Sequence, residues 1–109
     1  MRAFLLPALA LAAACQGPAR AAPPVATDHV DLPRSYMFRP EDIVVAPGTR
    51  VTWTNHDQFT HAVRLRAAGD TLMIMRPGDS VSYTFTHAGR FPYDCSFHAQ
   101  AMHGSVLVQ

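Results

Sequence analysis

The stretch RVTWTN, residues 50–55, decides the fold class, because its side chains alternate in character. Val51 and Trp53 fall on one face of an extended chain, and threonines occupy the positions between and after them. The stretch SVSYTFT, residues 80–86, repeats the pattern with Val, Tyr and Phe at every second position. Such alternation is typical of a half-buried β-strand, and a helix would space its apolar residues three or four apart.

Further short runs of strand character lie before, between and after these two stretches. Turn residues separate them, such as Pro47-Gly48 and the RPGD of residues 76–79. No stretch after residue 21 keeps a helical period for three turns. Short strands punctuated in this way predict an all-β sandwich or small barrel of about seven or eight strands. The additional runs are residues 43–46, 62–65, 71–75, 90–95 and 105–109.

The first 21 residues resemble an export signal and not a part of the fold. Arg2 precedes an apolar run, residues 4–14, that is too short to span a bilayer. Cleavage after Ala21 fits a small-residue site and gives a signal peptide of residues 1–21, which we favour. Alternatively, LAAAC resembles a lipobox, with a lipoprotein signal of residues 1–14 and a lipidated Cys15 as the only membrane anchor. Both interpretations predict an exported protein, periplasmic or associated with the cell envelope.

The remaining chain is one small domain with little net charge. We expect residues 22–28, which are rich in Pro and Ala, to form a flexible leader, and residues 29–109 to form the domain. From residue 22 on there are seven Arg, no Lys and eight acidic residues, and 7 − 8 gives a formal net charge of −1. A nucleic-acid partner would need a basic stripe, so the composition argues against one.

The stretch YDCSFHAQAMHG, residues 93–104, carries the chemistry. Its Cys95-x2-His98-x3-Met102 pattern gathers a thiolate, an imidazole and a thioether, which are soft or borderline donors. Mg²⁺ or Ca²⁺ would need oxygen ligands, and a structural zinc site rarely includes Met. A fourth ligand must come from elsewhere, and NHDQFTHAV, residues 55–63, offers His56 and His61. Two His, one Cys and a weak Met form the ligand set of an electron-transfer copper site.

In this order, the motifs resemble those of the cupredoxins, close to the plastocyanin, amicyanin and pseudoazurin group. Residues 36–63 match the Phe-x-Pro entry, the Pro-Gly turn and the loop His, and residues 89–109 match the Cys-His-Met loop and the last strand. The resemblance implies a Greek-key β-sandwich that binds one copper ion, Cu(I) or Cu(II). It also implies the metal ligands, which are His61, Cys95, His98 and Met102.

Several departures from the family pattern affect details of the site. Ala62 stands where Asn or Ser commonly follows the upstream His, and Phe97 stands where Pro is frequent. His61 is preferred to His56 because it directly precedes a strand. His103 should face away from the metal, because neighbouring residues of an extended segment point to opposite sides. It remains the competitor of Met102 for the axial position.

The resemblance implies a monomeric carrier that passes single electrons between transient redox protein partners, and not an enzyme. The sequence shows neither the length and His content of a multicopper oxidase nor a nucleophile–base set. The alternative is a periplasmic copper chaperone or copper-resistance protein with a similar ligand set. An apolar patch around His98, formed by Phe97, Ala99, Ala101 and Phe59, is the expected docking surface.

Overall fold

The computed structural model describes residue 3, residues 22–99 and residues 101–109. Apart from residue 3, the predicted export signal, including Cys15, lies outside the described residues. The described residues form nine strands, and none of them belongs to a helix that is long and apolar enough to cross a membrane. The strands are β1 Val25–Ala26, β2 His29–Leu32, β3 Asp42–Val45, β4 Thr49–Asn55, β5 His61–Leu65, β6 Thr71–Met75, β7 Ser80–Phe85, β8 Gly89–Asp94 and β9 His103–Val108.

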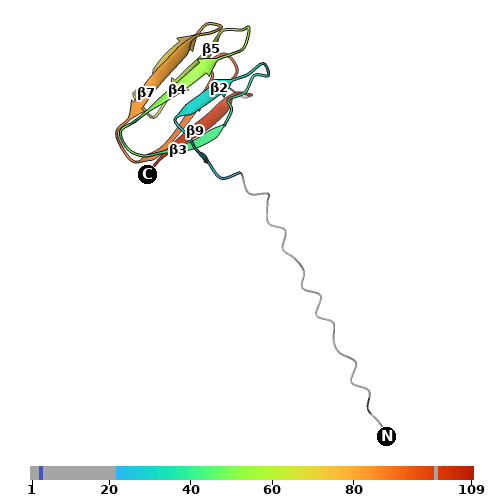
Figure 1. Ribbon diagram of the computed structural model, residues 1–109, viewed down its shortest axis with the longest axis vertical. Helices are drawn as coiled ribbons and strands as arrows, with labels where there is room; N and C mark the ends of the chain where they lie inside the picture. The colour runs from blue at the N-terminus through green and yellow to red at the C-terminus, as the bar shows by residue number, and fades with distance from the viewer. Residues whose placement is uncertain (1–2, 4–21, 100) are drawn as a thin grey trace.

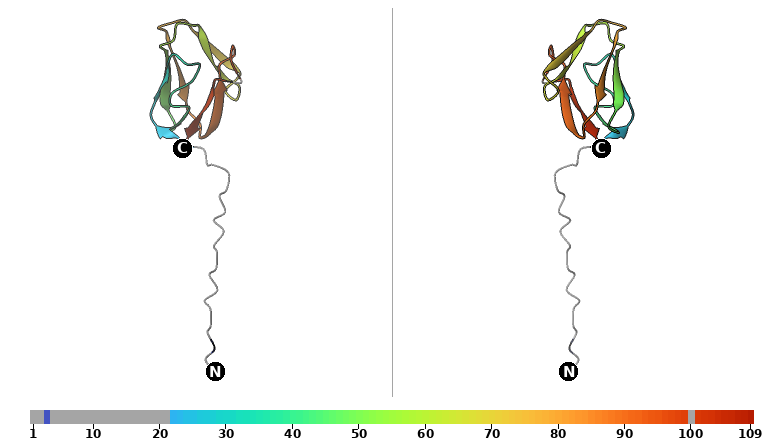
Figure 2. Two further views of the ribbon diagram at one scale, coloured as in Figure 1. Left: turned by 90° about the vertical axis from the view of Figure 1, so that its right-hand side faces the viewer. Right: turned by 90° about the vertical axis from the view of Figure 1, so that its left-hand side faces the viewer.

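The strands form two sheets that face each other (Figures 1 and 2). One sheet has the order β1-β3-β9-β8-β5-β6, and the other has the order β2-β4-β7. Three neighbouring pairs are parallel, β1 with β3, β2 with β4 and β3 with β9, and the others are antiparallel. The predicted all-β sandwich is confirmed.

The segment predicted as a flexible leader, residues 22–28, contributes a short strand. Val25 and Ala26 form β1 and pair in parallel with Ile43 and Val44 of β3. The β-branched Val25 suits this edge position, although its side chain is half exposed. The ordered part of the domain therefore begins before residue 29.

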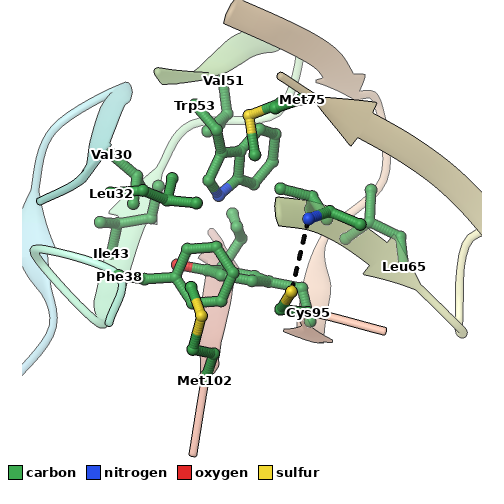
Figure 3. Packing of buried hydrophobic residues seen from close by; sticks show 14 of the residues in the cluster. Val30, Leu32, Phe38, Ile43, Val51, Trp53, Leu65, Met75, Cys95 and Met102 are labelled. Atoms are coloured by element: carbon green, nitrogen blue, oxygen red, sulfur yellow. Dashed lines mark hydrogen bonds between the residues drawn. The ribbon is translucent and has the colours of Figure 1, made fainter. Parts of the chain in front are cut away.

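The core lies between the two sheets and is organised around Trp53 (Figure 3). The indole ring is fully buried and packs against Tyr93 at 5.4 Å and Phe85 at 6.5 Å between ring centroids. The expectation that Trp53, Phe85 and Tyr93 form the core is confirmed. The alternation of residues 50–55 thus reflects β4, whose Val51 and Trp53 are buried against the opposite sheet.

One buried contact fixes the strands on either side of the Cys-His-Met loop. The Tyr93 hydroxyl of β8 donates to the carbonyl oxygen of Glu41 at 2.9 Å, and the backbone N–H of Ser105 in β9 donates to the same oxygen at 3.1 Å. Gly104 lies opposite Tyr93, and a Cβ atom there would collide with both the Tyr93 hydroxyl and the Glu41 carbonyl oxygen. Glycine permits this close approach of strand and ring.

Candidate metal centre

The loop between β8 and β9 holds its donor residues through backbone hydrogen bonds. The N–H of Cys95 donates to the Met102 carbonyl at 3.0 Å, so the two ends of the loop lie side by side. The N–H groups of His98 and Met102 donate to the carbonyls of Cys95 at 3.1 Å and of His98 at 2.8 Å. These bonds bring the three residues of the sequence motif to one end of the sandwich.

Cys95 is a free thiol with no solvent exposure. Its Sγ accepts a hydrogen bond from the backbone N–H of Ala62 at 3.4 Å, drawn as the dashed line in Figure 3. The Nδ1 atom of His61 lies 3.9 Å from the same sulfur. The backbone donor from position 62 needs no particular side chain, so the Ala at this position still leaves the sulfur with a partner.

His61 is fully buried, and its hydrogen bond to Asp57 determines which ring nitrogen carries the proton of the neutral ring. The Nε2 atom of His61 lies 2.8 Å from Oδ2 of Asp57, and this hydrogen bond lowers the pKa of Asp57 below its ordinary value. An ionised carboxylate can only accept, so Nε2 carries the proton. In the neutral ring, Nδ1 then has a free lone pair, and it faces Cys95. A ligating His commonly has such a carboxylate partner for its second nitrogen.

The Asp57 carboxylate is itself held in place by the β4–β5 loop. Its Oδ1 accepts a hydrogen bond from the backbone N–H of Gln58 at 2.7 Å. The backbone N–H of Asp57 donates to Oδ1 of Asn55 at 2.9 Å. Sequence reasoning missed Asp57. The spacing of four residues before His61 was the available signal, but it carries little information without the loop conformation.

Tyr36 is a second residue that the sequence did not reveal. Its ring makes edge-on contacts with His98 at 4.8 Å and with His61 at 5.7 Å between centroids, and it stacks on Phe59 at 5.7 Å. The backbone of Tyr36 has a φ of 51°, which a bulky residue rarely adopts. This turn places an aromatic ring across both imidazoles of the predicted ligand set.

The remaining candidates divide between the interior and the surface. Met102 is fully buried, whereas His103 is exposed and its Nδ1 lies 3.0 Å from Oε1 of Glu41. His56, the competitor of His61, is also exposed and bonds to Asp31. In this arrangement His61 and Met102, and not His56 and His103, belong to the buried end that contains Cys95.

Two of the donor atoms, Nδ1 of His61 and Sγ of Cys95, are close to the spacing that a metal requires. Among the described residues, no three His, Cys, Asp or Glu side chains are already gathered tightly enough to hold a metal ion. A nitrogen about 2.0 Å and a sulfur about 2.3 Å from one metal lie about 3.5 Å apart at a tetrahedral angle. The 3.9 Å between His61 Nδ1 and Cys95 Sγ exceeds this by only a few tenths of an ångström. The buried thiol and the oriented imidazole therefore fit a soft or borderline transition metal.

A family model described as "Copper binding proteins, plastocyanin/azurin family" matches residues 28–109. The chain belongs to this family. The resemblance to the cupredoxins that the sequence motifs suggested is thereby confirmed, and so is copper as the cofactor of the family.

Individual relatives agree with the family assignment. A chloroplastic plastocyanin of Tetradesmus obliquus is 34% identical over 85 residues, which are 67% of this chain and 59% of the relative. An amicyanin of Paracoccus denitrificans is 33% identical over 85 residues, which are 73% of this chain and 63% of the relative. The chain thus spans about three fifths of the length of these two proteins.

Solved structures show the same fold. A reduced amicyanin variant superposes with a TM-score of 0.67 at 31% identity, covering 74% of this chain and 80% of that one. A purple cupredoxin from Nitrosopumilus maritimus gives a TM-score of 0.65 at 24% identity, covering 74% of this chain and 98% of that one, and supports the fold alone. The cupredoxin-like sandwich predicted from the sequence is confirmed.

Proposed function

We propose that this cupredoxin is an exported electron carrier whose single copper ion is bound by His61, Cys95, His98 and Met102. The observation that carries the proposal is the buried thiol of Cys95 facing the free Nδ1 of His61. In the metal-free protein this contact is a long S–H···N hydrogen bond, and both atoms become copper ligands once the thiol proton leaves. Bound copper would supply a one-electron couple between Cu(I) and Cu(II).

The protein would contribute a rigid, dry environment for this couple. Cys95 directly follows β8, His61 begins β5, and both strands belong to the same sheet. The N–H of Ala62 directed at the sulfur tunes its donor strength. Asp57 fixes the ring of His61, and Tyr36 covers the edges of both imidazoles. Such packing limits rearrangement between the two oxidation states.

An exposed aromatic surface beside the site suits brief docking of a redox protein. Phe59 and Phe97 are 55% and 54% exposed, and Tyr36 is 40% exposed and contacts the half-buried His98. Weak redox encounters use small interfaces of this kind. The partners are thus other redox proteins bound transiently by a monomer, in the periplasm or at the cell envelope if the predicted signal directs export.

A copper chaperone or resistance protein is the second candidate, because it could use a similar ligand set. The experiment that separates the two is redox cycling of the copper-loaded protein in the presence of a Cu(I) chelator. An electron carrier should keep its copper and its colour through repeated reduction and reoxidation. Transfer of the copper to the chelator within the first reduction would contradict the proposal and favour the chaperone.

A further inference from the structure

Two histidines and one aspartate meet on the outer face of the three-stranded sheet, outside the candidate metal centre. The Nε2 atoms of His29 and His56 each lie 2.9 Å from the same oxygen, Oδ1 of Asp31. His29 and Asp31 are two residues apart on β2 and therefore share a face. His56 directly follows β4, the parallel neighbour of β2.

The backbone holds the three residues together independently of their side chains. The N–H of His56 donates to the carbonyl of Leu32 at 2.9 Å, which ties the end of β4 to the end of β2. Asp31 exchanges two hydrogen bonds of 2.8 Å with the backbone of Arg39. The side chains thus project from a fixed base, and their meeting does not depend on a mobile loop.

We propose that His29, Asp31 and His56 form a second metal site, which takes a borderline divalent ion such as Zn²⁺ or Cu²⁺ from solvent. Imidazole and carboxylate are good ligands for these ions. Two ligand atoms about 2.0–2.1 Å from one metal lie about 2.9 Å apart at the right angles of a tetragonal Cu²⁺ site and about 3.3 Å apart at the tetrahedral angle of Zn²⁺. The two Nε2–Oδ1 hydrogen bonds of 2.9 Å therefore hold the three groups within a few tenths of an ångström of either spacing.

Binding requires a change of tautomer and a small turn of the side chains. Without metal the three groups do not enclose one point, because both imidazoles converge on one carboxylate oxygen. A neutral imidazole can carry its proton on Nδ1 and free Nε2 for a metal. The side chains of His29, Asp31 and His56 are 46%, 45% and 58% exposed, so the rings can turn and an ion can enter.

Zn²⁺ titration by calorimetry at neutral pH tests the site, with the protein loaded beforehand with one equivalent of copper, kept as Cu(I), so that only the candidate metal centre is filled. We expect one bound equivalent for the unaltered protein, with the ring NMR signals of His29 and His56 shifting together. His29→Ala and His56→Ala should each lose this binding. His87→Ala is the matched control, since it removes an exposed histidine that belongs to a different turn, and it should keep the binding.

The outcome does not depend on the proposed electron transfer. The colour of the copper-loaded protein and its circular dichroism report separately on the first site and on the fold of each variant. The absence of Zn²⁺ binding would overturn the inference, as would binding that persists in both His29→Ala and His56→Ala. In either case the cluster would be a hydrogen-bonded contact between strands only.

Discussion

At the scale of single residues, the candidate centre depends on which nitrogen of His61 carries the proton. Asp57 accepts from Nε2 and so directs the Nδ1 lone pair at Cys95. The side chains of His61 and Asp57 are both buried. Rotating the imidazole of His61 to point its Nδ1 lone pair elsewhere would break the hydrogen bond between Nε2 and Asp57. One carboxylate outside the ligand set thus prepares the ring for a metal.

Asp57→Asn should therefore weaken copper binding although it removes no ligand. The amide can present either a donor or an acceptor to Nε2, so the tautomer is no longer fixed. Loss of such a partner typically costs about 10- to 100-fold in metal affinity. Competition with a chelator of known affinity measures this. Asp70→Asn is the control, because it neutralises an exposed carboxylate of the β5–β6 turn, away from the site, where Asn also tolerates the positive φ. An Asp57→Asn affinity equal to that of the control would contradict the role of Asp57.

Met102→Leu should keep copper and colour but raise the reduction potential. Met102 is fully buried and is the weakest donor of the proposed set, and its removal disfavours Cu(II) more than Cu(I). His103→Ala should hardly change the potential, because His103 points to Glu41 at the surface. Voltammetry of both variants separates the two residues. A larger shift for His103→Ala would mean that His103 is the axial ligand.

At the scale of elements, the site requires that β8 and β9 be held against the start of β3. Tyr93, Gly104 and Glu41 make this contact, and it leaves no space for a side chain at position 104. The Cys-His-Met loop joins the two strands immediately beyond it. The position of the loop is therefore fixed by packing at its base as well as by its own hydrogen bonds.

Gly104→Ala should destabilise the protein by about 1–3 kcal/mol, the usual cost of overpacking. The added methyl group would meet the Glu41 carbonyl and the Tyr93 hydroxyl. Urea unfolding of the metal-free protein measures the change. In a Tyr93→Phe background the cost of Gly104→Ala should become somewhat smaller, because the hydroxyl is gone while the ring carbon Cζ and the Glu41 carbonyl oxygen remain in the way. Equal costs in the two backgrounds would show that the hydroxyl does not oppose the methyl group.

The contact between β2 and the end of β4 should depend on pH. Partial burial alone would raise the pKa of Asp31, but the hydrogen bonds from His56 and His29 outweigh it, so the pKa is lower than in the unfolded chain. A carboxyl group whose pKa is lower in the folded protein stabilises the fold at pH values above its ordinary pKa of about 3.9. This stabilisation is lost as the pH falls through the pKa of the folded state. The Tm of the metal-free protein should drop in that range, and by less in Asp31→Asn. Equal drops would exclude Asp31 as a cause.

At the scale of the whole molecule, the sequence predicted which segments are strands and which of their faces are buried, but not which strands pair with each other. Alternation at Val51 and Trp53 identified the strand and its buried face, because the period of a strand is local. The parallel pairing of β3 with β9 joins residues more than sixty positions apart, and no local pattern encodes it. The short β1 was taken for part of a leader, because two residues are too few to show a period.

The same distinction applies to the site. The sequence could single out Cys95, His98 and Met102 as candidate ligands because they lie within one loop whose spacing is itself informative. Asp57 and Tyr36 could not, because their roles arise from a loop conformation and from a turn with positive φ that bring distant residues together. In the sequence, only the position directly before a strand distinguished His61 from His56. In the structure, His61 lies beside Cys95 and His56 does not.

The central claim is that the buried end of this sandwich binds one copper ion through the thiolate of Cys95. The visible and EPR spectra of the Cu(II)-loaded protein test it most directly. We predict an intense thiolate-to-copper absorption band and the narrow copper hyperfine splitting of a blue copper site, both abolished in Cys95→Ser. Weak absorption with an ordinary tetragonal EPR signal that Cys95→Ser leaves unchanged would contradict the account.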